Sequence, residues 1–382
     1  MREVCIVSAK RTPFGRFLGS LSRLTAVDLA CHAGDAALGS LDRSSIDQVI
    51  IGNILSAGQG MNMARQVGVR LGIPVSATAF TVNMMCASGM QAISLATQAI
   101  ASGESETILC GGSESMSQAP HLVPRSRTGL KLGDGKLVDS ILRDGLVDSF
   151  DHRHMALTAE ALASDYSLSR EEQDAFAATS QARAAAAAES GIFADELAPH
   201  DRLDRDEHPR PETTVESLGS LDPAFDSDGS ITAGNASGIN DGSAMLLLTS
   251  RETAASRGWP NLCVISATTA VGCEPARMGL GPVHAIRKLV DRANLRLDEF
   301  DQIEINEAFA AQVLACLREL DLPGERVNPN GGAIALGHPI GASGSRIVAH
   351  LAHRIASGDI RNGLASVCVG GGMGAAVSLT KP

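Results

Sequence analysis

The chain has 382 residues, of which 44% are hydrophobic and 20% charged, so it can bury a large core in two or three domains. A net charge of −11 without any basic stripe argues against nucleic-acid binding. Because no run of 18 apolar residues predicts a membrane span and no leader-like segment precedes the first strand-like run, we expect a cytoplasmic protein.

Aromatic residues make up only 3% of the chain, which favours α/β layers over a β-sandwich. In chain order, residues 49–51 predict a buried strand, 87–101 a helix and 107–110 another buried strand. Such alternation predicts a mostly parallel sheet that is covered on both faces.

The middle of the chain differs in composition from its two ends. Residues 118–155 predict long loops, and Ser169-Arg-Glu-Glu172 is a capping box that predicts a helix extending to Gly191. Residues 199–224 are charged and rich in proline, which is typical either of a functional excursion from a compact scaffold or of a solvated loop.

Four short matches indicate that the chain repeats itself. They occur in the same order and at nearly the same separation, which indicates two copies of one α/β domain with an insertion between them. The matching pairs are 5–9 with 263–267, 47–53 with 301–307, 87–89 with 342–344, and 110–112 with 368–371.

The eight cysteines include no CxxC pair and none at zinc-finger spacing with histidine, so we expect free thiols and no metal site. Cys5, Cys110 and Cys263 lie in strand-like runs and are expected in the core. Cys86 precedes a predicted helix, whose N-terminal partial charge should lower the thiol pKa and favour the nucleophilic thiolate. Taken alone, Cys86 could equally be structural.

His338, which follows a glycine-rich run and precedes Pro339, is the natural base for Cys86, although a packing histidine fits the same pattern. Cys368 ends an apolar run before three glycines. No helix is predicted to follow, which excludes a nucleotide-binding loop and leaves a core or an active-site thiol. Asn306 precedes a predicted helix, either as its N-cap or as a group that holds a water or an oxyanion.

Together these patches resemble those of the thiolases, the acyl-CoA C-acetyltransferases. The resemblance covers essentially the whole chain. It is carried by residues 9–13, 111–117, 116–121, 144–146, 154–155, 232–242, 306–310, 337–339 and 368–372. It implies that Cys86 carries the acyl group as a thioester, that His338 activates Cys86, and that Cys368 exchanges protons with the substrate α-carbon and the leaving thiol.

The resemblance also implies two oxyanion holes, one formed by His338 with a water held by Asn306, and one by the backbone N–H groups of Cys86 and Gly370. It places Ser237, His154, Met155, Met278, Leu146 and Phe309 along the pantetheine of coenzyme A. Arg210 and Ser217 match positions near the nucleotide. A lysine that is frequent in the family for the phosphates has no clear counterpart, because the excursion is shorter between about Pro199 and Asp206.

For the fold, the resemblance implies duplicated domains in five layers, α-β-α-β-α, with an inserted loop domain. The expected N-terminal half spans 1–117 with about 239–258, the loop domain 118–238, and the C-terminal half 259–382. Residues 119–140 resemble the loop that joins thiolase dimers into tetramers, so we expect a homodimer or a homotetramer.

The expected reaction converts two acetyl-CoA into acetoacetyl-CoA and CoA, or cleaves acetoacetyl-CoA or a longer 3-ketoacyl-CoA with CoA. These thioesters are substrates, and no cofactor is expected. A ketosynthase-like or hydroxymethylglutaryl-type condensing enzyme is the alternative, which the second thiol, Cys368, argues against; a non-catalytic CoA-binding subunit is a third. The motifs determine neither the acyl chain length nor the physiological direction.

Overall fold

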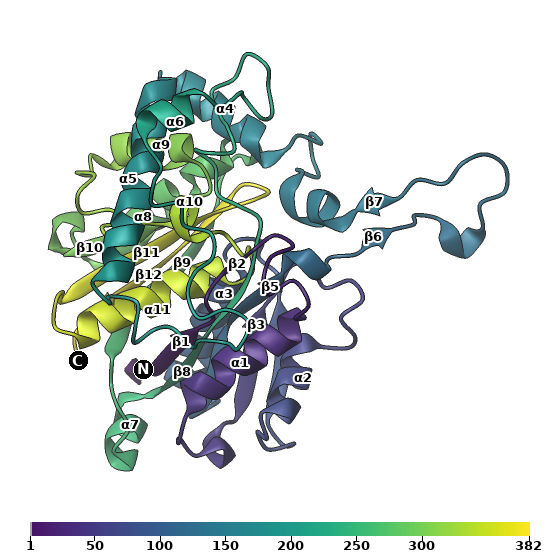
Figure 1. The fold of residues 1–382 in the computed structure, drawn as a ribbon. Coiled ribbons are helices and arrows are strands. Elements are labelled where there is room, and N and C mark those ends of the chain that lie inside the picture. Colours follow the sequence, from purple (N-terminus) through teal and green to yellow (C-terminus); the bar gives the residue numbers. More distant parts are fainter. Residues whose placement is uncertain (1) are drawn as a thin grey trace.

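The computed structural model describes residues 2–382 and consists of two similar halves on one ten-stranded mixed sheet (Figure 1). The first half contributes β1 (Val4–Arg11), β2 (Gly15–Arg16), β3 (Gln48–Gly52), β4 (Thr78–Val82), β5 (Thr107–Ser115) and β8 (Asn240–Ser250). The second contributes β9 (Cys263–Gly272), β10 (Gln302–Ile305), β11 (Asn362–Val369) and β12 (Met373–Thr380). The strand order is β10-β11-β12-β9-β1-β8-β5-β3-β4, with β2 paired to β8.

The two halves repeat one arrangement of strands. In the first, β3 runs parallel to β4 and β5, and β8 runs antiparallel to β5 and β1. In the second, β10 runs parallel to β11, β12 runs antiparallel to β11 and β9, and a parallel bridge from Ile303 to Val327 takes the place of β4. The predicted duplication is therefore confirmed.

Even a polar contact is repeated. The carboxylate of Asp47 accepts the N–H groups of Glu106 and Thr107 at 2.7 and 3.1 Å. The carboxylate of Asp301 accepts the N–H groups of residues 361 and 362 at 2.7 and 3.0 Å. Each aspartate thus fastens the start of one strand to the beginning of its parallel neighbour.

The prediction of a mostly parallel sheet is wrong. Both β8 and β12 are antiparallel to their neighbours, and β1 meets β9 antiparallel through Cys5–Val264 and Ile6–Cys263. The cause is plain for β12, which follows β11 through the short turn 370–372, because a hairpin reverses the chain direction. A buried apolar run indicates a strand but not its direction.

The five predicted layers are nevertheless present. The strands of the first half form one β layer and those of the second half form the other, with one helical layer between them and one on each outer face. The central layer is formed by α3 (Ser88–Ser102) and α11 (Ser343–Ala356), which pack against strands of both halves in one core. One outer layer contains α1 (Ala26–Leu38) and α2 (Met63–Arg70), and the other contains α8 (Gly281–Ala293) and α9 (Ala310–Leu320) (Figure 1). The short α7 (Arg251–Arg257) links β8 to β9.

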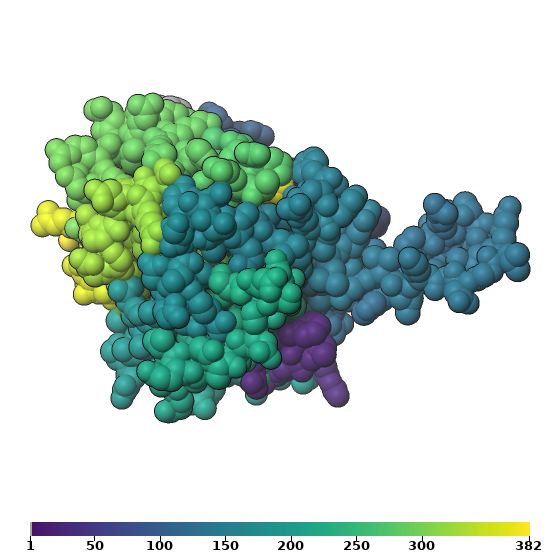
Figure 2. Space-filling model, turned by 90° about the horizontal axis from the view of Figure 1, so that it is seen from above, coloured from purple at the N-terminus to yellow at the C-terminus, as the bar shows by residue number. Residues whose placement is uncertain are grey.

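A long segment between β5 and β8 forms the rest of the molecule. It contains β6 (His121–Leu122), β7 (Val138–Asp139), a π-helical turn (Leu142–Leu146), α4 (Met155–Asp165), α5 (Arg170–Glu189) and α6 (Val215–Gly219). The β6–β7 hairpin projects far from the body (Figures 1 and 2). Among residues 2–382, no helix combines the length and apolarity needed to cross a membrane. The predicted domain boundaries remain predictions.

Most local predictions are confirmed. Residues 49–51 and 107–110 lie in β3 and β5, residues 87–101 match α3, and Ser169 caps α5 through a capping box with Glu172. Buried Cys5, Cys110 and Cys263 lie in strands of the core. Asn306, however, is not a helix cap, because the N-cap of α9 is Phe309.

The first turns of α3 and α11 approach each other at two glycines. A Cβ atom on Gly344 would lie 2.8 Å from Cβ of Met90, and one on Gly89 would lie 2.7 Å from Oγ of Ser345. Real Cβ contacts are not so short, so this helix contact requires residues without side chains.

We expect Gly344→Ala to lower the free energy of unfolding by about 1–3 kcal/mol, because the added methyl group forces the two helices apart. Denaturant unfolding measures this loss. Gly324→Ala is the control, since the nearest atom to a Cβ there is Cδ1 of Leu317 at 3.9 Å. Equal stability of the two variants would show that the helices can separate without cost.

Candidate active site

Three chemically active side chains from distant parts of the chain line one cavity of about 280 Å³. Cys86 comes from the loop between β4 and α3, His338 from the loop between α10 (Ala333–Leu336) and α11, and Cys368 from the end of β11. Gly370, in the β11–β12 turn, also lines the cavity. The structure thus brings these four predicted residues together.

A tight, strained loop presents Cys86. Met85 has φ of +46°, a left-handed conformation that is uncommon for a residue with a side chain. Its N–H donates to Oδ1 of Asn83 at 3.0 Å. Oγ of Ser88 donates to the Met85 carbonyl at 2.6 Å and accepts the N–H of Met84 at 2.9 Å. These bonds hold the strained backbone that turns Cys86 toward the cavity.

The expected lowering of the Cys86 pKa is wrong. Burial raises the pKa of this thiol to about 11, although hydrogen bonding to the backbone of Gly370 opposes that rise. Burial and the neighbouring Cys86 raise the pKa of Cys368 well above its ordinary value. Both cysteines are therefore neutral thiols at pH 7, because removing water from a thiolate costs more than the helix start and the local N–H groups supply.

His338 is held in a defined orientation and tautomer. Its backbone N–H donates to Oδ1 of Asn240 at 2.9 Å, and its Nδ1 lies 2.5 Å from Oγ of Ser343. The Ser343 hydroxyl donates its one hydrogen to the Pro339 carbonyl at 2.9 Å, so it accepts from Nδ1–H. The proton on Nδ1 leaves the lone pair on Nε2, which makes Nε2 the basic atom.

Burial, with a smaller contribution from the Arg346 charge, lowers the pKa of His338 to about 4. The imidazole is consequently neutral at pH 7. A neutral thiol and a neutral imidazole share this cavity, so the thiol proton can pass to Nε2 as the thiol attacks, instead of being lost beforehand.

Asn306 is fully buried, and within the described residues neither Nδ2 nor Oδ1 of its side chain has a hydrogen-bond partner. An unsatisfied buried amide is uncommon and is consistent with a bound water or a substrate oxygen. Asn306 does not line the cavity, although Ala308 and Phe309 do. Across residues 2–382, no group of three or more His, Cys, Asp or Glu side chains could hold a metal ion.

Six of the predicted coenzyme A contacts line the cavity, namely Leu146, His154, Met155, Ser237, Met278 and Phe309. Arg210 and Ser217 lie outside it; the Ser217 hydroxyl donates to the Thr214 carbonyl at 2.8 Å, next to the α6 start. Their roles at the nucleotide remain predictions. Phe225, which sequence reasoning missed, stacks on His154 with ring centres 4.4 Å apart and also lines the cavity.

Sequence reasoning also missed the residues that orient the catalytic loops. The buried carboxylate of Glu114 accepts the N–H groups of Ile54, Leu55 and Gly341, each at 3.1 Å. It thereby joins a loop of the first half to the loop that carries His338. Burial raises the pKa of Glu114 to about 7, and these hydrogen bonds oppose that rise. The sequence did contain a signal for Ser343, because it occupies the position in the second copy of the domain that Ser88 occupies in the first.

We expect Ser343→Ala to slow transfer of an acyl group to Cys86 roughly 100-fold, because His338 loses the partner that keeps the proton on Nδ1. Rapid-quench measurement of acylation tests this. Ser345→Ala is the control, since this buried hydroxyl in the same helix donates only to the Ala342 carbonyl. An unimpaired Ser343→Ala would show that the tautomer is fixed by other groups.

The low pKa of His338 also predicts a pH profile. The imidazole stays a neutral base until the pH falls to about 4, so kcat/KM for acylation should persist through pH 6 and be lost near 4. An acetyl thioester of pantetheine avoids titration of substrate phosphates. Half-loss near pH 6.5, the ordinary value for histidine, would contradict a buried neutral imidazole.

The chain matches known proteins over its whole length. Residues 4–252 match the family model "Thiolase, N-terminal domain", and residues 259–381 match "Thiolase, C-terminal domain". Proteins named acetyl-CoA acetyltransferase from Pseudomonas aeruginosa and Escherichia coli are 49% and 46% identical to it, each with 100% of both chains covered. The crystal structure of human mitochondrial 3-ketoacyl-CoA thiolase in complex with CoA superposes with a TM-score of 0.97 at 46% identity, covering 100% of this chain and 98% of that one. The chain belongs to the thiolase family.

Proposed function

We propose that this chain is an acyltransferase that moves an acetyl group between CoA thioesters by a reversible Claisen condensation. The observation that carries the proposal is the shared cavity, in which Cys86 and Cys368 accompany a neutral His338 whose proton is on Nδ1. The names of the relatives, acetyl-CoA acetyltransferases and a 3-ketoacyl-CoA thiolase, support it. The second thiol argues against a ketosynthase-like enzyme.

The first half of the reaction forms an acyl-enzyme. Sγ of Cys86 attacks the thioester carbonyl and its proton passes to Nε2 of His338. The C–S bond to CoA then breaks, and the leaving thiolate takes a proton from Cys368. A tetrahedral oxyanion develops on the way, and oriented N–H donors stabilise such a charge; the backbone N–H groups of Cys86 and Gly370 are the proposed donors.

The second half forms the carbon–carbon bond. The Cys368 thiolate removes a proton from the α-carbon of a second acetyl-CoA, and the resulting enolate attacks the acetyl group on Cys86. The C–S bond to Cys86 breaks, giving acetoacetyl-CoA, and the sulfur recovers its proton from His338. A water held by the unpaired amide of Asn306 is proposed to stabilise the enolate together with His338.

The proposed substrates are acetyl-CoA, acetoacetyl-CoA or longer 3-ketoacyl-CoA, and CoA. The thioester itself activates both the carbonyl and the α-carbon, so the proposed steps use no metal or organic cofactor. Ser237 and the apolar wall residues would contact pantetheine, and Arg210 and Ser217 the nucleotide end.

We further propose a cytoplasmic homodimer that pairs into a homotetramer through residues 119–140. The β6–β7 hairpin, which projects from the body (Figure 2), supports this assembly, since the side chains of Leu130, Leu132 and Leu137 between its strands are exposed. Large apolar side chains exposed on a projection are typical of interaction surfaces.

Incubation with acetyl-CoA alone should add one acetyl group to Cys86, because acylation precedes condensation. Peptide mass spectrometry locates the label. Cys86→Ser should abolish turnover and labelling while CoA still binds, and Cys31→Ser, at a half-buried thiol outside the cavity, should change neither. A label on another cysteine, or none, would contradict the assigned nucleophile.

A further inference from the structure

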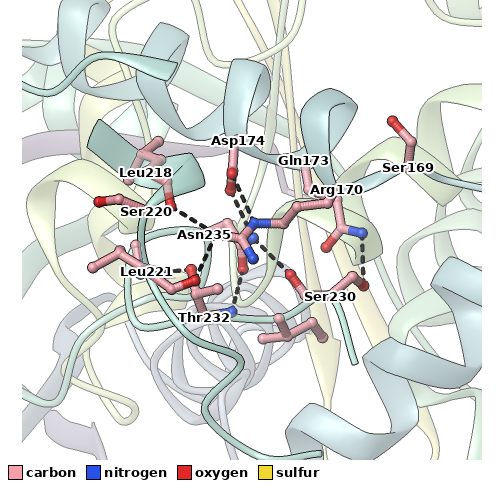
Figure 3. Close-up of polar contacts among 12 residues, drawn as sticks. Ser169, Arg170, Gln173, Asp174, Leu218, Ser220, Leu221, Ser230, Thr232 and Asn235 are labelled. Carbon is pink, nitrogen blue, oxygen red and sulfur yellow. Dashed lines mark hydrogen bonds and ion pairs between the residues drawn. The ribbon is translucent and has the colours of Figure 1, made fainter. Parts of the chain in front are cut away.

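The first turns of α5 bind two segments of the cavity wall, and the proposed reaction makes no use of these side chains (Figure 3). We call residues 218–225 the outer wall segment and residues 230–237 the inner wall segment. Between α6 and β8, where every residue is described, no helix or strand is formed. Apart from residues 218 and 219, which end α6, the two segments have no regular structure, so side chains from other elements help to set their positions.

Arg170 holds the outer wall segment. Its Nη2 donates to the carbonyl oxygens of Leu218 and Leu221 at 2.6 and 3.0 Å, and its Nε donates to Oδ2 of Asp174 at 2.7 Å. The segment ends at Phe225, whose ring stacks on His154 in the cavity wall. The position of that wall therefore depends on the guanidinium group.

Asp174 binds the inner wall segment, whose first two residues also donate their N–H groups to the carboxylate of Glu160 in α4. Its Oδ1 accepts from Nδ2 of Asn235 at 2.9 Å, and Oδ1 of Asn235 accepts the N–H of Thr232 at 2.9 Å. The Asp174 carboxylate is only 2% exposed, and Asn235 is fully buried, so water does not compete for these bonds.

The inner wall segment is hydrogen-bonded to the residues that follow Asn306. The N–H of Ala310 donates to the Asn235 carbonyl at 2.9 Å, and the N–H of Ser237 donates to the Ala308 carbonyl at 3.0 Å. These bonds join the segment to residues 308–310, which follow Asn306 and include Phe309 of the wall.

The ion pair of Arg170 with Asp174 thus links both segments, in addition to the N–H of Ala224, which donates to the Ile231 carbonyl at 2.9 Å. A guanidinium group is planar and presents several donors at fixed angles, so Arg170 can bind a carboxylate and two carbonyl oxygens at once. One rigid group and its partner on the next helical turn therefore hold both wall segments against α5.

We propose that Arg170, Asp174 and Asn235 form a positioning network that sets the coenzyme A side of the cavity and thereby the KM for CoA. None of the three touches a reacting atom in the proposed mechanism. This inference rests on the proposed function and adds residues that determine how tightly that site binds CoA.

The test is thiolysis of acetoacetyl-CoA at varied CoA concentration. Arg170→Met keeps an unbranched apolar side chain but removes the three hydrogen bonds to Asp174, Leu218 and Leu221. The KM for CoA should rise about tenfold, which corresponds to the loss of one hydrogen bond to a charged group. The rate of acetyl transfer to Cys86 from S-acetyl-N-acetylcysteamine should not change, because this short thioester reaches only the reacting end of the cavity.

A pair of exchange variants separates positioning from packing. Asn235→Asp places two carboxylates face to face and should raise the KM for CoA. Adding Asp174→Asn restores an amide opposite a carboxylate, so part of the rise should be recovered, although Arg170 loses its ion pair and the Ser230 carbonyl loses the bond that Nδ2 of Asn235 donates at 3.0 Å. Arg318→Met is the matched control: Arg318 also binds the first turn of α5, through Glu172 at 2.7 Å, but not the wall segments.

An unchanged KM in Arg170→Met and Asn235→Asp, with the unaltered enzyme active, would overturn the network's role. So would a rise that follows only the loss of folded protein in thermal unfolding, or a double variant whose KM is higher than that of Asn235→Asp. If the unaltered enzyme shows no thiolysis at all, the proposed function fails instead, and the two failures are distinguishable.

Discussion

The contact between the first turns of α3 and α11 is the constraint on which the rest of the molecule depends. At Gly89 and Gly344 the two helices approach more closely than any side chain would allow. Cys86 lies just before one helix and His338 just before the other, so the contact that joins the two halves also sets the spacing of nucleophile and base. A wider crossing would leave the fold recognisable and separate the reacting groups.

Burial determines the electrostatics of the site once these groups are together. A helix start favours a thiolate, but the cavity that holds Cys86 and His338 is lined mostly by apolar side chains. Desolvation raises the pKa of Cys86 to about 11 and lowers that of His338 to about 4, so both are neutral in the resting enzyme. In the proposed reaction, charge then develops only as the thiol attacks, and the backbone N–H groups of Cys86 and Gly370 are the proposed donors to it.

Sequence reasoning predicted most of what depends on residue type and spacing. The repeat gave the duplicated fold, and the glycine-rich patches gave Cys86, His338 and Cys368. Sequence reasoning failed where the outcome depends on tertiary packing. An apolar run does not determine the direction of its strand, and the pKa of Cys86 depends on the residues that bury its thiol. Arg170 escaped notice for the same reason, since it acquires its role from carbonyl groups about 50 residues along the chain.

The two copies of the domain differ in the connection between their last two strands, and that difference bears on how they divide the proposed work. In the second half, β11 and β12 are joined by the short turn 370–372, which brings the backbone of Gly370 to the cavity. In the first half, the corresponding strands β5 and β8 are separated by residues 116–239, which supply much of the wall on the coenzyme A side. The predicted reacting residues thus come from the repeated scaffold, and many of the predicted coenzyme A contacts come from an insertion that lines the cavity with helix ends and loops. An insertion of that kind must be fastened by side chains, which is the part that the ion pair of Arg170 with Asp174 performs.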